Sequence, residues 1–401
     1  MISWSESERW LQNLGWSSDP FEHFEASSDP RLGEYLVGHQ AFPAAWNQAP
    51  ALIFAPHGGG KTAACLFTAR QAWVERRAFP LIYLPAVHSE FRRPITLERH
   101  LEGITRAAAI ALFLTLVIRP AYFLGAQPSE QQALVGAFAD FLPAELEYYV
   151  EWLRGGESPA VLPAHLGTSY LFPEIPSPAQ VLILCDALAV AAKKYKSNPS
   201  SFSVGRFDTQ VSLIRSTTGQ FVIDLLVDGI DGAPETFGES ASQMEWLAPL
   251  IEQAPRWGAE QIYLKAFVPI NTRATLRERF KKTLAEFGET EITWTTDKLA
   301  ELLRQRIYAA SGGQVNSLDA YASPDLANIE TRIAESVVPL PREALLLTSR
   351  VLDNYAARVG DAPGSIEPPD VERALDWYKE DREWVGADRA LSDSDVLVTA
   401  G

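Results

Sequence analysis

The segment ALIFAPHGGGKTAAC, residues 51–65, decides the fold of this 401-residue chain. Its apolar first part, Ala51–Ala55, predicts a buried strand, and a glycine-rich turn follows at residues 56–60. Lys61 and Thr62 come next, and the small residues after them favour a helix. This order of strand, glycine turn and helix is typical of a phosphate-binding P-loop. The alternative is a glycine-rich turn that precedes a Lys-Thr pair by chance.

The glycine turn has a direct use in binding phosphate. Successive backbone N–H groups in such a turn point inward and form an anion-binding nest, and the helix that begins there adds its positive dipole end. In a site of this kind Lys61 reaches the β- and γ-phosphates, and the Thr62 hydroxyl binds Mg²⁺. Ala55 replaces the first glycine of the pattern G-x-x-x-x-G-K-[ST], at the end furthest from the phosphates. We therefore predict a nucleotide site at His57, Gly58, Gly59, Gly60, Lys61, Thr62 and Ala63, with the His57 side chain facing solvent.

Composition limits the classes of function. With 47% hydrophobic and 21% charged residues, the chain has an ordinary globular composition and the length of two or three domains. A net charge of −16 argues against general nucleic-acid binding, which needs basic surface. A local basic run at Lys193, Lys194 and Lys196 keeps a nucleic-acid contact open as a less favoured alternative. The two cysteines, Cys65 and Cys185, lie in apolar settings and suit a cytoplasmic protein with reduced thiols.

No membrane role is expected from the sequence. The polar N-terminus MISWSESERW does not have the pattern of a signal peptide. The longest apolar run, residues 107–118, is too short to span a bilayer, so we expect a buried helix there. The six histidines show no spacing typical of a metal site.

The order of elements along the chain predicts an α/β fold, in which helices flank a largely parallel sheet and a C-terminal helical lid follows. Strands are expected at residues 51–55, 79–87, 221–227 and 261–268, with a further strand region opening near residue 202. After residue 271 we expect only helices, at 274–287, 297–310, 341–359 and 368–379. The expected domains are a leader at 1–48, a P-loop core at 49–290 with a helical insertion at about 97–200, a lid at 291–380 and an acidic tail at 381–401.

A P-loop nucleotide site also needs a carboxylate that holds the water shell of Mg²⁺. Asp228 directly follows the apolar run at residues 221–227, so we predict that it lies at the carboxyl end of a strand and serves the metal. The alternative is a strand that ends in an ordinary polar turn. A group that orients the attacking water is a recurring part of phosphoryl transfer. The position after Asp228 is Gly229, and the next acid is Asp231.

The segment LVDGID, residues 226–231, resembles the Walker B segment of STAND-type P-loop ATPases, a signal-transduction branch related to AAA+ proteins. That pattern continues with Glu, where this chain has Gly232. The leader LGWSSDPF, residues 14–21, is similar to the segment before the P-loop in bacterial ATPases of defence and signalling operons. The resemblance extends over roughly residues 12–355.

This resemblance implies ATP as the nucleotide, Mg²⁺ as its metal, and catalytic roles for Asp228 and Asp231. It implies a sensor residue at Asn271 or Thr272, where a helix cap is the alternative. It also implies that Arg342 reaches the phosphates from the lid, where a solvated arginine at a helix start is the alternative.

The same resemblance implies that leader residues line the adenine pocket, with simple core packing as the alternative: Phe21, Leu36 and Val37. Candidates for an arginine finger acting on a neighbouring subunit are Arg273, Arg277 and Arg279, although a solvated helix face is the simpler interpretation.

We expect an ATP-binding, slowly hydrolysing switch that regulates or assembles a protein partner or a homo-oligomer, in the setting of bacterial defence. Slow turnover is expected because glycine occupies positions 229 and 232, the two places where a base for water would stand. The alternatives are a structural subunit that never hydrolyses ATP and a DNA-linked AAA+ ATPase.

Overall fold

The structure, a computed structural model, describes residues 9–39, 42–88, 96–195, 204–232, 236–360 and 362–380. The acidic tail expected at 381–401 and Lys196 lie outside these residues. The chain divides into two compact units. The sheet unit comprises Ala41–Phe54 and Ala64–Glu291, and the helical unit comprises Met1–Gln40, Ala55–Ala63 and Ile292–Gly401. The glycine turn therefore groups with the helical unit, although the strand before it and most of the helix after it belong to the sheet unit.

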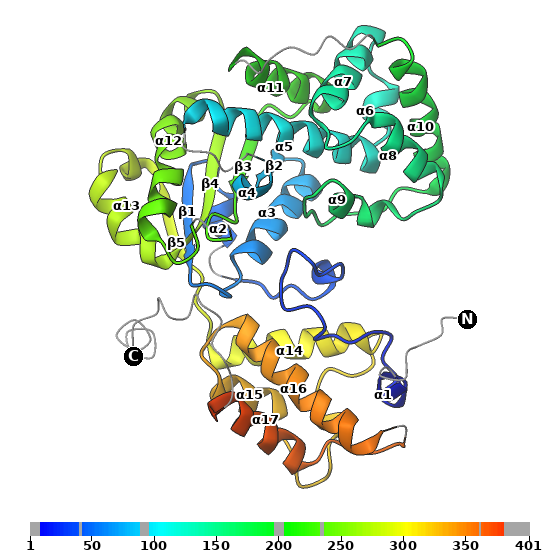
Figure 1. Ribbon diagram of the computed structural model, residues 1–401, viewed down its shortest axis with the longest axis vertical. Helices are drawn as coiled ribbons and strands as arrows, with labels where there is room; N and C mark the ends of the chain where they lie inside the picture. Colours follow the sequence, from blue (N-terminus) through cyan, green and yellow to red (C-terminus); the bar gives the residue numbers. More distant parts are fainter. Residues whose placement is uncertain are drawn as a thin grey trace. The chain divides into compact units, whose positions relative to one another are not determined.

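A five-stranded parallel sheet forms the centre of the sheet unit, in the order β2-β3-β4-β1-β5 (Figure 1). Its strands are β1 Ala51–Ala55, β2 Phe79–Tyr83, β3 Ile223–Val227, β4 Ile262–Pro269 and β5 Gly288–Glu291. The first three are buried at every position because apolar side chains leave both faces of the sheet to be covered by other elements. The predicted α/β fold with a parallel sheet is confirmed, and four strands lie in the regions that the sequence predicts. The strand predicted at 79–87 is too long, because it ends at Tyr83 and Pro85 begins the short helix α4, Pro85–His88.

The edge strand β5 was not expected. Its sequence, GETE, is polar and only four residues long, and its residues are exposed or half-buried. The acids are neutralised in place, because Arg273 donates to Glu291 at 2.8 Å and Arg277 to Glu289 at 2.6 Å. The helix predicted over 274–287 is confirmed as far as Arg279 and is wrong beyond it. The structure has a shorter helix α13, Arg273–Arg279, and a 3₁₀ turn, Thr283–Glu286, before the strand.

Helices surround the sheet in this unit: α2 Phe42–Trp46, α3 Lys61–Glu75, α4 Pro85–His88, α5 Leu97–Ile118, α6 Ala121–Leu124, α7 Pro128–Phe141, α8 Leu146–Arg154, α9 Leu162–His165, α10 Pro178–Ala192, α11 Val204–Thr218 and α12 Ser240–Ala259. The central helix α5 packs against β2 on one side and against α7 and α11 on the other. The strand region expected near residue 202 is wrong, since the described residues from Val204 onward form α11; residue 202 itself lies outside the described part.

Helix α5 has the length and hydropathy of a membrane span, with 22 residues and a mean hydropathy of 1.8 over 18 of them. However, 89% of that window is buried inside the protein. The Thr96 side chain caps the helix start by accepting from the Arg99 N–H, and small and branched apolar residues then face the core on all sides. The run at 107–118 is thus part of a buried core helix, as predicted.

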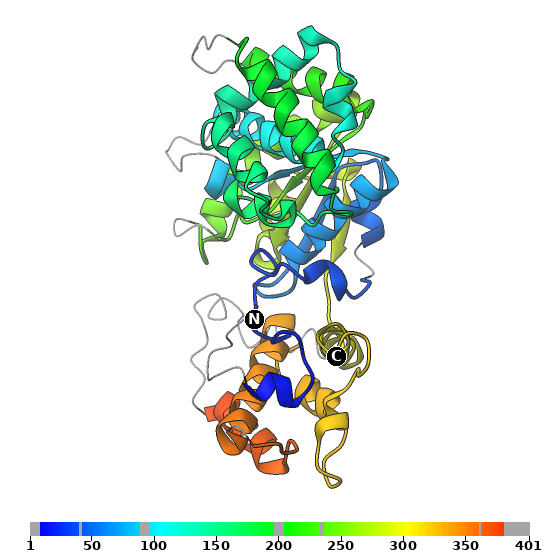
Figure 2. The same cartoon turned by 90° about the vertical axis from the view of Figure 1, so that its right-hand side faces the viewer.

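The helical unit has its own apolar core, built by α14 Thr296–Ala310, α15 Ile329–Ser336, α16 Pro341–Val359 and α17 Pro368–Glu380. The leader, with its short helix α1 Arg9–Asn13, adds Leu11, Leu14 and Trp16 to the same core. Figure 2 shows this N-terminal segment beside the C-terminal helices. The leader and the C-terminal helices are therefore one structural body, joined through side chains almost 300 residues apart.

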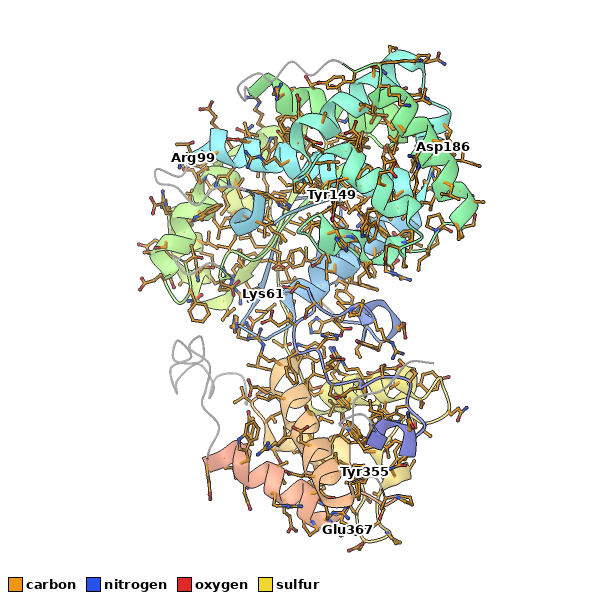
Figure 3. All side chains as sticks on the ribbon, turned by 45° about the vertical axis from the view of Figure 1, so that its right-hand side comes forward. Lys61, Arg99, Tyr149, Asp186, Tyr355 and Glu367 are labelled. Carbon is orange, nitrogen blue, oxygen red and sulfur yellow. The ribbon has the colours of Figure 1, made fainter. Side chains whose placement is uncertain are left out.

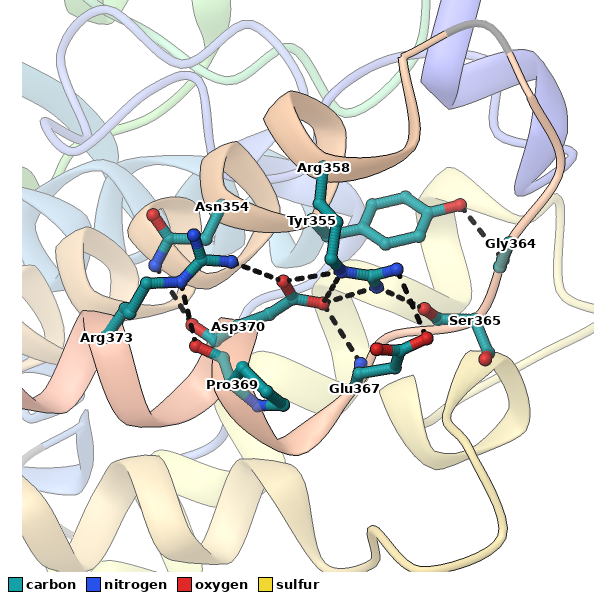
Figure 4. A network of polar contacts seen from close by, with 9 residues as sticks. All are labelled: Asn354, Tyr355, Arg358, Gly364, Ser365, Glu367, Pro369, Asp370 and Arg373. Carbon is teal, nitrogen blue, oxygen red and sulfur yellow. Dashed lines mark hydrogen bonds and ion pairs between the residues drawn. The ribbon is translucent and has the colours of Figure 1, made fainter.

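A polar network closes the corner between α16 and α17 (Figure 4). The buried Asp370 carboxylate accepts from Arg358 at 2.6 Å, from Arg373 at 3.1 Å and from the Glu367 N–H at 3.0 Å. Burial alone would raise the pKa of Asp370, but these hydrogen bonds and the two nearby arginine charges outweigh it and lower the pKa. The start of α17 is thereby fixed against the end of α16.

Candidate phosphate-binding site

The glycine turn between β1 and α3 contains two residues with left-handed backbone conformation. Gly58 and Gly60 have φ values of +76° and +93°, which side-chain-bearing residues rarely adopt. Gly59 lies between them in a tight place, because a Cβ there would be 3.0 Å from the Pro56 carbonyl oxygen. Each of the three glycines is thus required by backbone conformation or by space.

Lys61 is the first residue of α3 and is labelled in Figure 3. Its exposed fraction is 6%, so it is almost fully buried. Its ammonium donates to the carbonyl oxygens of Pro56 at 3.1 Å and Ala55 at 3.3 Å. Ala55 ends β1 and is fully buried, so alanine in place of the first glycine of the motif fits the strand end. Thr62 and Ala63 follow on the first turn of α3 and are half-buried. The cation is thus held against the backbone of the glycine turn.

Side chains of the helical unit lie directly on the glycine turn. Arg342, the second residue of α16, makes a close hydrogen-bonding contact with the His57 imidazole, and its Cβ is 3.2 Å from where a Cβ on Gly58 would be. The other end of the Arg342 guanidinium donates to Glu25 at 3.2 Å. The sequence predicts that the His57 side chain faces solvent. In the structure its imidazole instead contacts the Arg342 guanidinium.

A second contact comes from Trp294, whose indole N–H donates to the Gly59 carbonyl oxygen at 3.0 Å. No motif in the sequence marks this tryptophan as part of the site. The available signal was its place as an aromatic residue just before Thr295, which caps α14.

Asp228 follows β3 directly and is 2% exposed. Its backbone N–H donates to the Tyr83 carbonyl oxygen at 3.2 Å, which extends the pairing of β2 and β3 by one residue. Burial raises the pKa of the Cys65 thiol on α3, and the negative charge of Asp228 raises it further. The Asp228 carboxylate thus acts electrostatically on the second turn of the helix that Lys61 begins.

The turn after Asp228 is closed by a hydrogen bond from the Gly232 N–H to the Gly229 carbonyl oxygen at 3.1 Å. Gly229 has a φ of +72°, so a catalytic glutamate at this position would be strained. Asp231 is half-buried within this turn.

Two buried histidines support the carboxyl end of β2 beside Asp228. His88 accepts from the Leu84 N–H at 3.0 Å through Nδ1, and His100 Nδ1 is 2.9 Å from the Tyr83 hydroxyl. Burial lowers the pKa of both histidines to about 4. They are therefore neutral at physiological pH and serve as packing and hydrogen-bonding groups.

The remaining predicted residues have these positions. Asn271 is exposed just beyond β4, whereas the Thr272 hydroxyl is buried and donates to the Pro269 carbonyl oxygen at 2.7 Å. Phe21 and Val37 are buried in the core of the helical unit, as in the packing alternative.

Of the three arginine-finger candidates, two form the β5 ion pairs already described and Arg279 lies over the Phe280 ring. All three arginines therefore make contacts within their own chain.

The donors expected for Mg²⁺ are the Thr62 hydroxyl and the Asp228 carboxylate. Both are hard oxygen ligands of the kind that Mg²⁺ prefers, and few protein ligands suffice because Mg²⁺ keeps several waters. Within the described part of the chain, there is no cluster of three or more His, Cys, Asp or Glu side chains that could hold a metal by themselves.

Comparison with known proteins does not identify the site. No family model and no curated protein matches the chain. Among solved structures it is similar to the ORC2 protein of Aeropyrum pernix, determined in ADPNP and ADP complexes. The alignment covers 94% of this chain and 76% of that chain, with 13% identity and a TM-score of 0.43. At this level the likeness carries no inference about function.

Proposed function

We propose that this chain binds ATP and Mg²⁺ at the glycine turn and acts as a slowly hydrolysing switch that regulates or assembles a partner, in the setting of bacterial defence. One observation carries the proposal: the phosphate-binding turn is part of the helical unit, because Ala55–Ala63 group with the leader and the C-terminal helices. A ligand held by this turn acts directly on the packing of that unit. Such a differential interaction is what allows a nucleotide to shift a conformational equilibrium.

Each residue of the site has a chemical task in this proposal. Backbone N–H groups of the turn and the Lys61 ammonium bind the phosphates, since a compact cation suits phosphate oxygens. Thr62 and Asp228 hold Mg²⁺ and its waters, and the metal neutralises phosphate charge when bound. Arg342 senses the phosphates from the helical unit, and its contact with His57 on the turn supports this role. Asn271 is exposed at the end of β4 and has the weakest support among these residues.

Slow turnover follows from the groups available to orient water. Glycine stands at positions 229 and 232, which leaves Asp231 as the acid nearest to Asp228 in sequence among the residues after β3. A poorly placed base forfeits roughly 10²–10⁴-fold in rate, and an absent arginine finger about 10³–10⁵-fold. We therefore expect the isolated chain to hydrolyse ATP well below roughly 1 s⁻¹, the low end of ordinary enzyme rates.

Equilibrium binding of ATP, followed by steady-state phosphate release against protein concentration, tests the proposal. We expect saturable Mg²⁺-dependent binding, slow release, and a rise in specific rate if copies of the chain supply a missing group to each other. Absence of ATP binding would leave a purely structural subunit. Fast release independent of concentration would refute the switch, and salt-dependent DNA binding by the same preparation would favour a DNA-linked ATPase.

A further inference from the structure

The contact between Trp294 and the glycine turn joins a side chain to a backbone group that the phosphate-binding chemistry depends on. The indole N–H donates to the Gly59 carbonyl oxygen at 3.0 Å, and the six-membered part of the ring lies 3.7 Å from where a Cβ on Gly60 would be. The ring thus covers one side of the Gly59–Gly60 peptide, and the hydrogen bond fixes which way that peptide faces.

The geometry of the peptide bond relates this contact to the direction of the Gly60 N–H. In a planar trans peptide the C=O of one residue and the N–H of the next point in opposite directions. Because the Gly59 carbonyl points to Trp294, the Gly60 N–H points away from Trp294. A peptide between two glycines has little intrinsic preference against flipping, since neither residue has a Cβ that restricts its dihedral angles. The hydrogen bond to the Gly59 carbonyl therefore adds a constraint on the direction of the Gly60 N–H.

Neighbouring groups of the helical unit fix the position of the Trp294 ring. Its ring packs against His39 at a centroid distance of 5.7 Å, and His39 Nε2 is 2.8 Å from the Thr293 carbonyl oxygen. The indole also packs on the apolar core of the helical unit, and the Thr295 side chain just after it caps α14. The donor therefore has a defined position before any ligand arrives, which is the requirement for preorganisation.

We propose that Trp294 is a positioning residue for phosphate binding: its indole N–H holds the Gly59–Gly60 peptide in the orientation that directs the Gly60 N–H at the phosphate chain. This inference rests on the proposed nucleotide site and specifies how the helical unit tunes it. The ligand class is a polyphosphate, so the base is not part of the effect. Loss of one neutral hydrogen bond should weaken binding about five- to tenfold.

The experiment compares two tryptophans of the helical unit. Trp294→Phe removes the donor to Gly59, and Trp16→Phe removes a similar indole donor, to the Tyr321 hydroxyl at 3.0 Å, which does not involve the glycine turn. Affinities for MgATP and for magnesium tripolyphosphate are measured on the full chain. We expect Trp294→Phe to weaken both about five- to tenfold and Trp16→Phe to change neither by more than about twofold.

A subtler change guards against misfolding of the phenylalanine variant. Incorporation of 3-benzothienylalanine at position 294 keeps the bicyclic ring and replaces only the N–H by sulfur, and the same loss is expected. In ¹⁵N-glycine-labelled protein, the Gly60 amide should give one sharp signal in the natural protein, which shifts with tripolyphosphate. The signal should broaden in the variant as the peptide exchanges between two orientations.

The experiment distinguishes a failure of the Trp294 role from a failure of the proposed nucleotide binding. If the natural protein binds neither MgATP nor tripolyphosphate, the proposed function and this inference both fail. If it binds both and the two changes at position 294 have no effect, only the role of Trp294 is refuted. A loss for MgATP without a loss for tripolyphosphate would show that Trp294 contacts the base, which also overturns the proposal.

Discussion

The glycine turn follows β1 and the Asp228 turn follows β3, but different parts of the molecule support these two turns. Trp294 and Arg342 from the helical unit contact the glycine turn. The Asp228 turn depends on its own unit, through the β2 backbone and the buried histidines beside it. One element is thus packed against a body of helices, whereas the other is fixed by the sheet.

This difference separates two tasks that a nucleotide switch must combine. A rigid carboxylate is useful for a metal, because the ligand geometry that Mg²⁺ demands is strict. A phosphate-binding turn that is packed on helices lets the occupied and empty states favour different arrangements of those helices. Changes to the turn should therefore affect binding and the helical unit, whereas changes near Asp228 should affect the metal and the sheet.

The largest effect is expected for Lys61→Ala. Loss of the ammonium removes a charge-assisted phosphate contact and should weaken ATP binding by at least about a hundredfold, below easy detection. The fold should persist, because the Lys61 ammonium donates to backbone carbonyls of the turn and contributes no apolar side chain to the core of either unit. Fluorescent ATP-analogue binding with circular dichroism checks both, and the exposed Lys281→Ala serves as the control. Unchanged affinity in a folded Lys61→Ala protein would remove the P-loop assignment.

The elements that sequence predicts well are those whose signal is local. Apolar runs predict the buried strands, and the glycines with the Lys-Thr pair predict a P-loop. What the sequence does not disclose is which distant side chain meets a local element. Strand β5 was missed because its stability comes from arginines on α13 rather than from apolar residues of its own. The Trp294 and Arg342 contacts were likewise beyond local reasoning, since they join residues more than 230 positions apart.

Charged residues buried inside apolar strands also have partners that the strand sequences do not reveal. Asp224 and Lys265 interrupt two runs that otherwise read as strands, and both are fully buried. Lys265 donates to the Ala49 carbonyl oxygen at 2.5 Å, and Arg77 lies 3.2 Å from the Asp224 carboxylate. Burial lowers the pKa of Lys265 to about 8. The partners come from loops and could not be deduced from the strands alone.

The second largest effect concerns acid and the sheet unit. His88 and His100 have pKa values near 4 in the folded protein, below the 6.5 of an unfolded histidine. Above pH 6.5 both states are neutral and stability is full. As the pH falls from 6.5 toward 4 only the unfolded chain takes up the protons, so the free energy of unfolding falls. By pH 5 the loss is about 2 kcal/mol for each ring.

Urea unfolding at pH 7.5, 6 and 5 measures this loss. The variant His88→Gln should flatten the pH dependence by about half, even if it lowers stability at pH 7.5. The matched control is His165→Gln, because His165 is exposed and its ring lies against Trp152 at the surface. Equal pH slopes in all three proteins would show that the buried histidines near β2 do not remain neutral in the folded state.

A smaller effect is expected for Asp228→Asn, and it should depend on the metal. Asparagine keeps the size of the side chain but loses the charge that attracts Mg²⁺ and its waters, so MgATP affinity should fall about tenfold. Binding of ATP in the presence of a chelator should change much less. Calorimetry with and without Mg²⁺ gives the comparison. Equal losses in the two conditions would show that Asp228 supports the sheet but not the metal.

The smallest effect is expected for Arg342→Gln, and it sharpens the contrast between the two turns. The guanidinium is partly exposed and shared between His57 and Glu25, so solvent screens part of its interaction. We expect ATP affinity to fall only about threefold, with no dependence on Mg²⁺, in contrast to Asp228→Asn. Because the arginine joins the turn to α16, limited proteolysis should show that ATP protects the helical unit less in this variant. Arg350→Gln on the same helix is the control, since Arg350 lies over the Trp377 ring. A variant that keeps full ATP protection would mean that the glycine turn and α16 are packed together but not coupled, and the switch would have to operate through Trp294.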